Sequence, residues 1–310
     1  MNRTMRQPVP PYAGNAILLR EATAAILVVG VLGTLLVWSF WPTLERLAER
    51  WSIDPQYSHG FLVPIFAAVI LWLKKPAEIA WRPSVWGLPL LGGALVVRWY
   101  AARMDLTHVD GACLIVSLLG ATLLVGGWDV LRWTAPAILF LGFMVPLPDV
   151  INDGIAIPLR RLATIASTYV LQTFGYPAMS EGNTIQIDDI RLGVIEACSG
   201  LGMLMTFLAL ATAMAIVAPG PIVDRLVLVA SSIPIAVFAN VLRIIVVAMA
   251  DVRFGKHHHD SIDKILGWPM MPLALILLWL ELRFLRLLFV PTNAVAPLSV
   301  PLSPWLERAK

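Results

Sequence analysis

Apolar stretches almost free of Asp, Glu, Lys and Arg alternate with short polar connections along most of the chain. A helix needs about 20 mostly apolar residues to cross about 30 Å of hydrocarbon. The pattern therefore predicts an all-α, polytopic membrane bundle with about eight transmembrane helices. The expected spans are Ala22–Leu44, Pro55–Leu73, Pro83–Val97, Gly111–Trp128, Thr134–Pro148, Ala197–Val223, Leu226–Ala250 and Ile265–Leu280, the last running on to Val290.

The segment between the fifth and sixth spans is less apolar and predicts two further elements. Pro158 suits the first turn of a helix, and apolar residues then recur at helical spacing on one face, as in a helix on the membrane surface. A shallow ninth span is the alternative. Thr184–Ile187 alternates polar and apolar positions, and Arg191–Ile195 follows a turn, which together predict a small hairpin.

Composition narrows the class of protein. Apolar residues make up 58% of the 310 residues and charged residues only 14%, whereas a soluble domain has about 25% charged residues. This composition excludes disorder and argues against a soluble globule. The net charge of +3 is too small to indicate nucleic-acid binding. The two cysteines, Cys113 and Cys198, form neither a disulfide framework nor a zinc-binding spacing.

The domain organisation follows from the spans. We expect a cytoplasmic N-terminal tail over residues 1–20, a transmembrane domain over 21–290 and a Pro-rich tail over 291–310. The first apolar run is long enough to remain as a span rather than be cleaved as a signal peptide. Eight spans place both ends on one side. Lys and Arg residues are divided nearly evenly between the two sides of the membrane. The positive-inside rule therefore only slightly favours termini in the cytoplasm.

Cys198 is expected where a loop becomes a helix. The free N–H groups and the dipole of a helix N-terminus lower the pKa of a thiol placed there, and the thiolate is a nucleophile. A small apolar residue buried in the core is the alternative reading, and it is the reading that we give to Cys113, which lies within a span.

Arg243 interrupts an apolar span, and an ionisable residue inside a span is a functional candidate by default. It follows Arg225 by about 27 Å of helix, so it should lie near the outer boundary, with Asn240 one turn earlier on the same face. An arginine that only reaches to the interface is the alternative.

Three adjacent histidines, His257-His258-His259, precede the eighth span. They favour a general acid and base, because histidine titrates near neutral pH. A metal site and a solvated loop without a role are the alternatives. With spans that alternate in direction, Cys198, Arg243 and the histidines all fall on one membrane face. A thiol, an imidazole and a cation together would suit acyl transfer.

Two sequence elements around these candidates are specific: Glu196-Ala197-Cys198-Ser199-Gly200-Leu201, and Asn240 followed three residues later by Arg243-Ile244. Through them the chain resembles the exosortase/archaeosortase family of membrane proteins. The resemblance runs from residue 57 to about residue 285. Weaker matching pieces are Tyr57-Ser58-His59-Gly60-Phe61-Leu62-Val63-Pro64, Val145-Pro146-Leu147-Pro148, Gly267-Trp268 and Met270-Met271-Pro272-Leu273-Ala274.

The resemblance implies a cysteine transpeptidase, without a metal or other cofactor, in a bacterial inner membrane with its active site on the extracytoplasmic face. Its partners would be exported proteins that end in a short Pro-Glu-Pro-like motif, a transmembrane helix and a basic tail. Cys198 and Arg243 match the family's catalytic positions. Many members carry Arg where this chain has Gly202, and the family's histidine position is Asp263 here. We therefore assign the proton carrier to His259, one helical turn upstream.

Two other functions stay open at this point. One is a transporter in which Arg243 binds the substrate, although no repeated half is visible in the sequence. The other is a family member that has lost catalysis and acts as a partner in assembly or polysaccharide export, an alternative that Asp263 keeps open.

Overall fold

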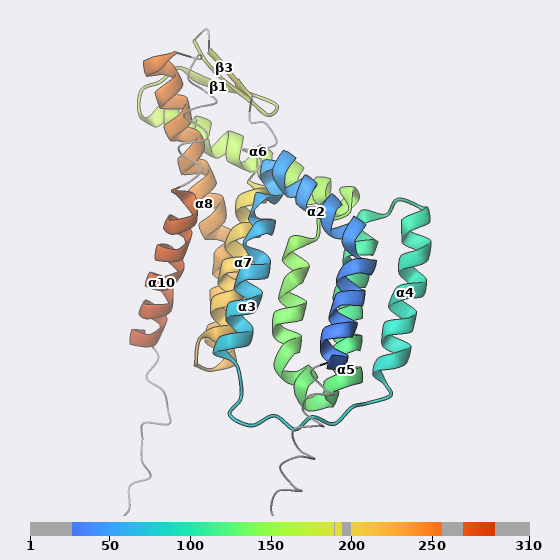
Figure 1. Ribbon diagram of the computed structural model, residues 1–310. Helices are drawn as coiled ribbons and strands as arrows, with labels where there is room; N and C mark the ends of the chain where they lie inside the picture. The colour runs from blue at the N-terminus through green and yellow to red at the C-terminus, as the bar shows by residue number, and fades with distance from the viewer. Residues whose placement is uncertain (1–26, 189, 194–199, 256–268, 289–310) are drawn as a thin grey trace, which may run out of the picture.

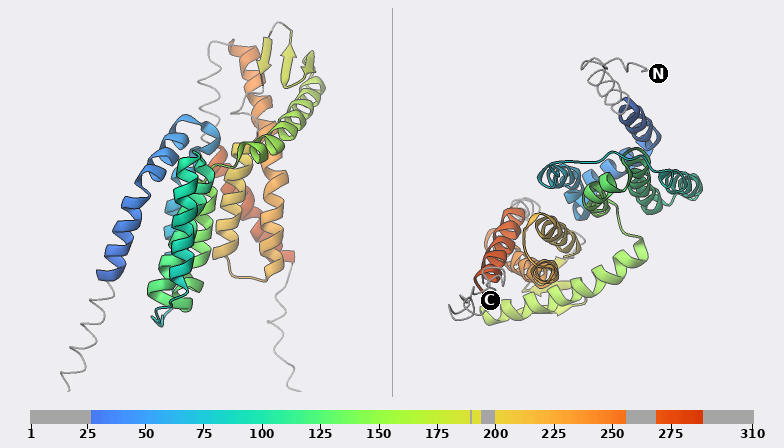
Figure 2. Two further views of the ribbon diagram at one scale, coloured as in Figure 1. Left: turned by 90° about the vertical axis from the view of Figure 1, so that its right-hand side faces the viewer. Right: turned by 90° about the horizontal axis from the view of Figure 1, so that it is seen from below.

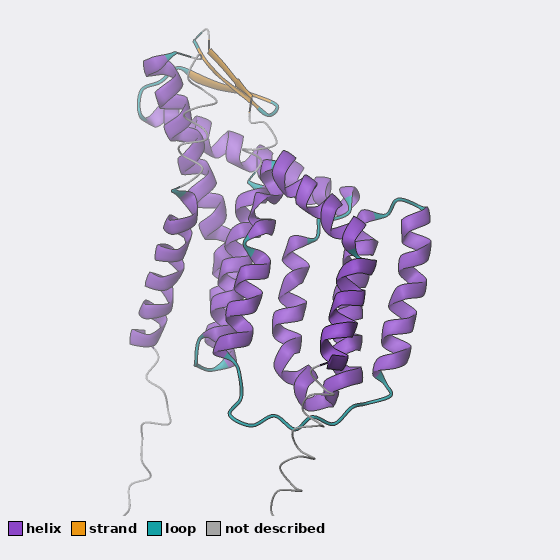
Figure 3. Cartoon of the chain, viewed as in Figure 1, coloured by secondary structure: helices purple, strands orange, loops and turns teal. Residues whose placement is uncertain are grey.

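The computed structural model describes residues 27–188, 190–193, 200–255 and 269–288, and these are mostly helical (Figures 1 and 3). The first helix, Leu27–Ser39, bends by 59° into the next one. The remaining helices are α2 Trp41–Ile53, η1 Pro55–Phe61, α3 Val63–Leu73, α4 Gly87–Arg103, α5 Thr107–Phe140, η2 Leu141–Met144, α6 Asp149–Thr173, α7 Leu201–Val217, α8 Ile222–Phe254 and α10 Met270–Leu288. η1 and η2 are 3₁₀ helices.

Membrane spans are present, but eight of them are not confirmed. By length and composition, three helical segments of the described chain can cross a membrane: Pro55–Leu73, Thr107–Met144 and Ile222–Phe254. The bent pair Leu27–Ser39 and Trp41–Ile53 raises the number to four when it is taken as one span. Large apolar side chains cover much of the surface, among them Trp72, Val96 and Phe238 with exposed fractions of 75%, 69% and 65%. Such a surface suits lipid rather than water.

Gly127 divides α5 into two helical arms. Its φ of 76° and ψ of −166° are not helical, and a Cβ there would lie 1.8 Å from the Arg82 carbonyl oxygen. Only glycine is compatible with both constraints. Gly127 lies near the end of the expected stretch 111–128, so the break comes shortly before the expected connection to the stretch 134–148.

The short elements gather at one end of the bundle. Figures 1 and 2 show α2, α6 and the strands together above the upright helices, and we call this the sheet end. α8 has 33 residues and is about 50 Å long. It is therefore longer than the hydrocarbon layer, and its C-terminal half continues to the sheet end.

The sheet has three antiparallel strands in the order β1-β2-β3. β2 (Thr184–Ile187) and β3 (Ile190–Gly193) form the expected hairpin, while β1 (Ala178–Glu181) was not expected. The expected start of the surface helix was wrong: α6 begins at Asp149, directly after Pro148, and Pro158 lies in its interior. Pro158 has no N–H to donate to the Gly154 carbonyl, so the helix lacks one backbone hydrogen bond there.

Three apolar cores hold the elements together. The first joins α2, α3 and α5, the second joins α6 and the sheet to the C-terminal half of α8, and the third joins α7, α8 and α10. Seen from below, the helices form two groups that α6 links (Figure 2). Phe66 of α3 packs against both the first and the third core, so the two groups meet between α3 and α7.

A buried carboxylate joins α2, α4 and α5 at the sheet end. Asp110, with an exposed fraction of 1%, accepts hydrogen bonds from Thr43 Oγ1 at 2.6 Å, Arg46 Nη2 at 2.7 Å and Arg98 Nε at 3.1 Å. Arg98 also donates to the Ser39 carbonyl oxygen. The network therefore fixes the bend between the first helix and α2 against the α4–α5 pair.

Candidate active site

Of the three residues expected to carry chemistry, Arg243 lies within the described part of the chain. Cys198 and His259 lie outside the described residues, as do the tails 1–20 and 291–310. Whether the three side chains meet on one face therefore stays a prediction. The elements on either side of Cys198 are described from Gly200 onward and up to Gly193.

Arg243 belongs to a buried polar face of α8. Its exposed fraction is 9%, that of Asn240 is 2% and that of Asp251 is 0%. Residues three, four, seven, eight and eleven apart share one side of a helix, so the three form one stripe. Sequence reasoning overlooked Asp251, although its spacing of eight from Arg243 is the signal that could have found it.

Gly200 connects this stripe to the start of α7. It is the N-cap residue of α7 and adopts the left-handed conformation, with φ of 80° and ψ of −13°. A Cβ placed on Gly200 would lie 3.0 Å from Asn240 Nδ2. The Asn240 side chain therefore packs directly on the turn from which α7 starts, and Arg243 lies one turn further along the same face.

Gly202 brings η1 onto the same turn. A Cβ on Gly202 would lie 3.0 Å from Gln56 Cα and 3.1 Å from the Gln56 carbonyl oxygen. Both are backbone atoms, so they cannot move aside as a flexible side chain would. This close packing gives a physical reason for glycine, rather than a residue with a side chain, at position 202.

We call the contact of Asn240 and Gln56 with the first turn of α7 the junction. A polar pocket of about 190 Å³ lies beside the junction at the sheet end. It is formed by α2, the start of η1 and the first turns of α6. Its lining residues are Arg50, Asp54, Gln56, Asp149, Asn152, Asp153 and Arg160. Gln56 therefore contributes its side chain to the pocket and its backbone to the contact with Gly202.

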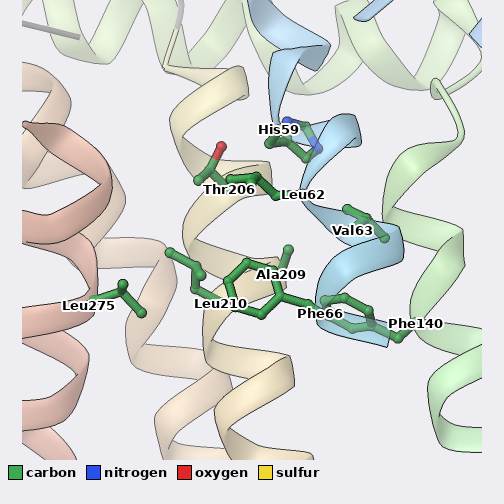
Figure 4. A pocket seen from close by; sticks show the side chains of 9 residues that line it. All are labelled: His59, Leu62, Val63, Phe66, Phe140, Thr206, Ala209, Leu210 and Leu275. Carbon is green, nitrogen blue, oxygen red and sulfur yellow. The ribbon is translucent and has the colours of Figure 1, made fainter. Parts of the chain in front are cut away.

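An apolar pocket of about 100 Å³ lies on the other side of η1, among α3, α5, α7 and α10 (Figure 4). Its lining residues are His59, Leu62, Val63, Phe66, Phe140, Thr206, Ala209, Leu210 and Leu275. His59 stands at the end nearest the sheet end. Its Nε2 lies 3.2 Å from the Phe143 carbonyl oxygen, and its exposed fraction is 4%. This contact indicates a role in joining η1 to η2.

The junction is suited to chemistry on a peptide carbonyl. It places the buried Asn240 amide at the N-terminus of α7, where backbone N–H groups also favour negative charge, and the buried Arg243 follows one turn further along α8. In acyl-transfer enzymes, hydrogen-bond donors that point at the developing oxyanion in a water-poor site usually make the largest contribution to catalysis.

Comparison with known proteins identifies the family. No curated protein and no solved structure matches the chain. The family model described as transmembrane exosortase (Exosortase_EpsH) matches residues 51–280. This range contains η1, α7, α8, the apolar pocket and every lining residue of the polar pocket except Arg50. It also contains the sequence elements around Cys198 and Arg243. Because the match covers well over half of its length, the chain belongs to the transmembrane exosortase family.

Proposed function

We propose that this protein is a cysteine transpeptidase that cleaves C-terminal sorting signals from exported proteins and transfers the cleaved proteins to an acceptor. The observation that supports this most directly is the packing of Asn240 on Gly200, two residues after Cys198 in the sequence. Covalent geometry limits the Cα atoms of residues two apart to about 7 Å. A nucleophile at position 198 would thus be tethered to the buried stripe that contains Arg243.

The proposed first step forms a thioester. The Cys198 thiolate attacks the carbonyl carbon of the scissile peptide bond, and the negative charge that develops on the carbonyl oxygen is stabilised by Arg243. The C–N bond then breaks. The leaving amine takes a proton from His259, and the C-terminal fragment departs while the rest of the substrate stays bound to sulfur.

The second step releases the product. An acceptor amine attacks the thioester carbon and gives up a proton to His259, and the thiolate of Cys198 leaves. A new amide bond is formed and the enzyme returns to its starting state. Water in place of the amine would give hydrolysis.

Histidine is the better proton carrier for both steps. Asp263, at the family's histidine position, would be ionised near neutral pH and could accept but not readily donate a proton. An amine leaving group needs a donor, which supports the assignment of His259.

The proposed substrates are exported proteins that carry a short motif, one transmembrane helix and a basic tail. The substrate helix would lie in the bilayer beside the bundle and present the motif at the sheet end. The proposed location is the inner membrane of a bacterium, with the sheet end on the extracytoplasmic side, because exported proteins arrive there.

Replacement of the two cysteines tests the proposed nucleophile. In cells that contain a tagged substrate, Cys198→Ala should leave the protein in the membrane while uncleaved substrate accumulates. Cys113→Ala is the matched control, because Cys113 is buried within α5 and should process substrate at close to the wild-type rate. Normal processing by Cys198→Ala would exclude Cys198 as the nucleophile.

A further inference from the structure

An exposed row of apolar side chains runs along most of α6. Its members recur at alternating intervals of four and three residues, which keeps them on one side of a helix. They are Ile151, Ile155, Pro158, Leu162, Ile165 and Tyr169. Ile155 is half-buried and the other five are exposed, with an exposed fraction of 71% at Tyr169. We call this row the α6 stripe. It is about 27 Å long and contains no charged side chain.

Hydrogen bonds near both ends of α6 fix its rotation about its own axis. Near the N-terminus, Gln56 Nε2 and Tyr57 Oη both donate to Asn152 Oδ1, at 2.6 and 3.0 Å. Near the C-terminus, Gln172 Nε2 donates to the Ala178 carbonyl oxygen of β1 at 2.7 Å. In the described part of the chain, no member of the α6 stripe belongs to any of the three apolar cores. The stripe is therefore held away from the protein interior.

α6 begins where a membrane span ends. Thr107–Met144 is long and apolar enough to cross a membrane, and only Val145–Pro148 separate it from the first residue of α6, Asp149. Four residues of extended chain reach at most about 14 Å. Trp51 Nε1 donates to the Met144 carbonyl oxygen at 2.9 Å, which fixes the end of this span against α2. α6 therefore starts close to the boundary between hydrocarbon and lipid headgroups.

The polar side of α6 faces the sheet, and the stripe faces away from it. Arg161 is exposed and lies eleven residues before Gln172, which is about 20° around the helix. Arg161 thus shares the side from which Gln172 donates to β1. Leu162, in the stripe, is turned from Arg161 by about 100°. Apolar side chains on one side and a charged group on the other are typical of a helix that lies in the membrane interface.

The arrangement of the helices leaves room for lipid below α6. Seen from below, α6 passes from one helix group to the other and no upright helix covers it (Figure 2). The same figure shows α6 rising toward the strands, so Tyr169 lies further from the span ends than Ile151 does. A tyrosine suits that higher position, because its ring and hydroxyl favour the headgroup level. Lipid acyl chains are therefore the partner that best fits the stripe.

We propose that α6 is a membrane-interface anchor, in which the α6 stripe inserts among the acyl chains of one leaflet while Arg161 stays among the headgroups. Because α6 also holds the sheet through β1, the anchor sets the height of the sheet end above the hydrocarbon. It involves none of the proposed catalytic residues, so it is independent of the proposed chemistry.

Spin labels on single cysteines test the anchor in the full-length protein, reconstituted in phosphatidylcholine vesicles with Cys113 and Cys198 replaced by alanine. Leu162→Cys and Ile165→Cys place labels in the stripe. Arg161→Cys, the preceding residue, is the matched control. Oxygen concentrates in hydrocarbon and a nickel chelate stays in water, so the relaxation of each label reports its surroundings. Both stripe labels should collide more often with oxygen than with the chelate, and the control label should show the reverse.

Three results would overturn the anchor. Stripe labels that collide mainly with the chelate would place the stripe in water. Stripe labels that meet neither reagent, or that broaden each other's spectra, would mean that protein or a second copy of the chain covers the stripe. A control label that also favours oxygen would make α6 a shallow span rather than an interface helix.

A charge placed in the stripe gives a second readout without labels. An ionised side chain among acyl chains is costly, so Leu162→Asp should lower the midpoint of thermal unfolding in the same vesicles by several degrees. Arg161→Asp should keep a midpoint near that of the wild type, because position 161 faces the headgroups. Equal midpoints for the two variants would contradict contact between the stripe and the acyl chains.

Discussion

Arg243 is expected to act through its geometry as well as its charge. A guanidinium can hold an oxyanion or carboxylate through two parallel hydrogen bonds, whereas a lysine ammonium is a compact point charge. Arg243→Lys should therefore reduce kcat by about 100-fold, as does loss of one oxyanion donor in acyl-transfer enzymes. Arg253→Lys, on the same helix but exposed, should keep full activity in the same cleavage assay. If Arg243→Lys is nearly as active as the wild type, Arg243 serves only to anchor the helix at the membrane interface.

Gly200 is expected to be irreplaceable for a different reason. Its left-handed φ of 80° disfavours any side chain, and a Cβ would crowd Asn240. Gly200→Ala should lower the midpoint of thermal unfolding in detergent and also reduce cleavage, since it disturbs the turn next to Cys198. Gly154→Ala is the control. Nothing lies within 4 Å of a Cβ on Gly154, and alanine in a helix is more favourable by about 0.5–1 kcal/mol. A Gly200→Ala protein with unchanged midpoint and rate would contradict this description of the junction.

At the scale of elements, Asp110 should contribute most to the cohesion of α2, α4 and α5. Asp110→Ala leaves Arg46 and Arg98 without their buried partner, and breaking a buried ion pair from one side costs about 3–5 kcal/mol. Asp105→Asn removes the other negative charge beside Arg46, 3.4 Å away and 88% exposed, keeps a residue that tolerates the left-handed backbone there, and should cost no more than about 0.5 kcal/mol. Thermal unfolding of the two variants in the same detergent compares them directly. Equal shifts in the midpoint would mean that the buried network is not a principal support.

Most elements were predictable from the sequence because their signals are local. Long apolar runs predicted the helical bundle. The alternation of polar and apolar residues predicted a strand over Thr184–Ile187, and β2 has the same bounds. β1 was missed because Ala178-Met179-Ser180-Glu181 lacks both alternation and β-branched residues. The bend after Ser39 was missed because the apolar run continues through it, and Asp110 fixes it from a distant part of the chain.

The candidate site was predictable only in part. Arg243 and Cys198 could be identified by residue type and position. A charge in an apolar span and a thiol at the expected start of a helix can both be recognised from the sequence alone. The contacts of Gly200 with Asn240 and of Gly202 with Gln56 join segments far apart in sequence. No spacing rule predicts such contacts, nor the meeting of α2, η1 and α6 around the polar pocket.

For the whole molecule, we predict that the sheet end faces the extracytoplasmic side of the membrane. Single cysteines at Glu181, in β1, and at Glu78, in the loop at the opposite end of the bundle (Figure 1), report on the two faces once Cys113 and Cys198 have been replaced by alanine. A membrane-impermeant thiol reagent on intact cells should label Glu181→Cys at once and Glu78→Cys only after lysis. The reverse pattern would place the sheet end in the cytoplasm and detach it from exported substrates.

If catalysis proceeds through a thioester on Cys198, mass spectrometry of the purified protein during turnover should detect that intermediate. With a peptide substrate and no added amine, the protein should gain the mass of the N-terminal fragment, and hydroxylamine should remove that mass. Cys198→Ala should show no adduct and no cleavage, while Cys113→Ala should show both. Cleavage without any adduct, or an adduct that persists in Cys198→Ala, would exclude Cys198 as the site of a thioester.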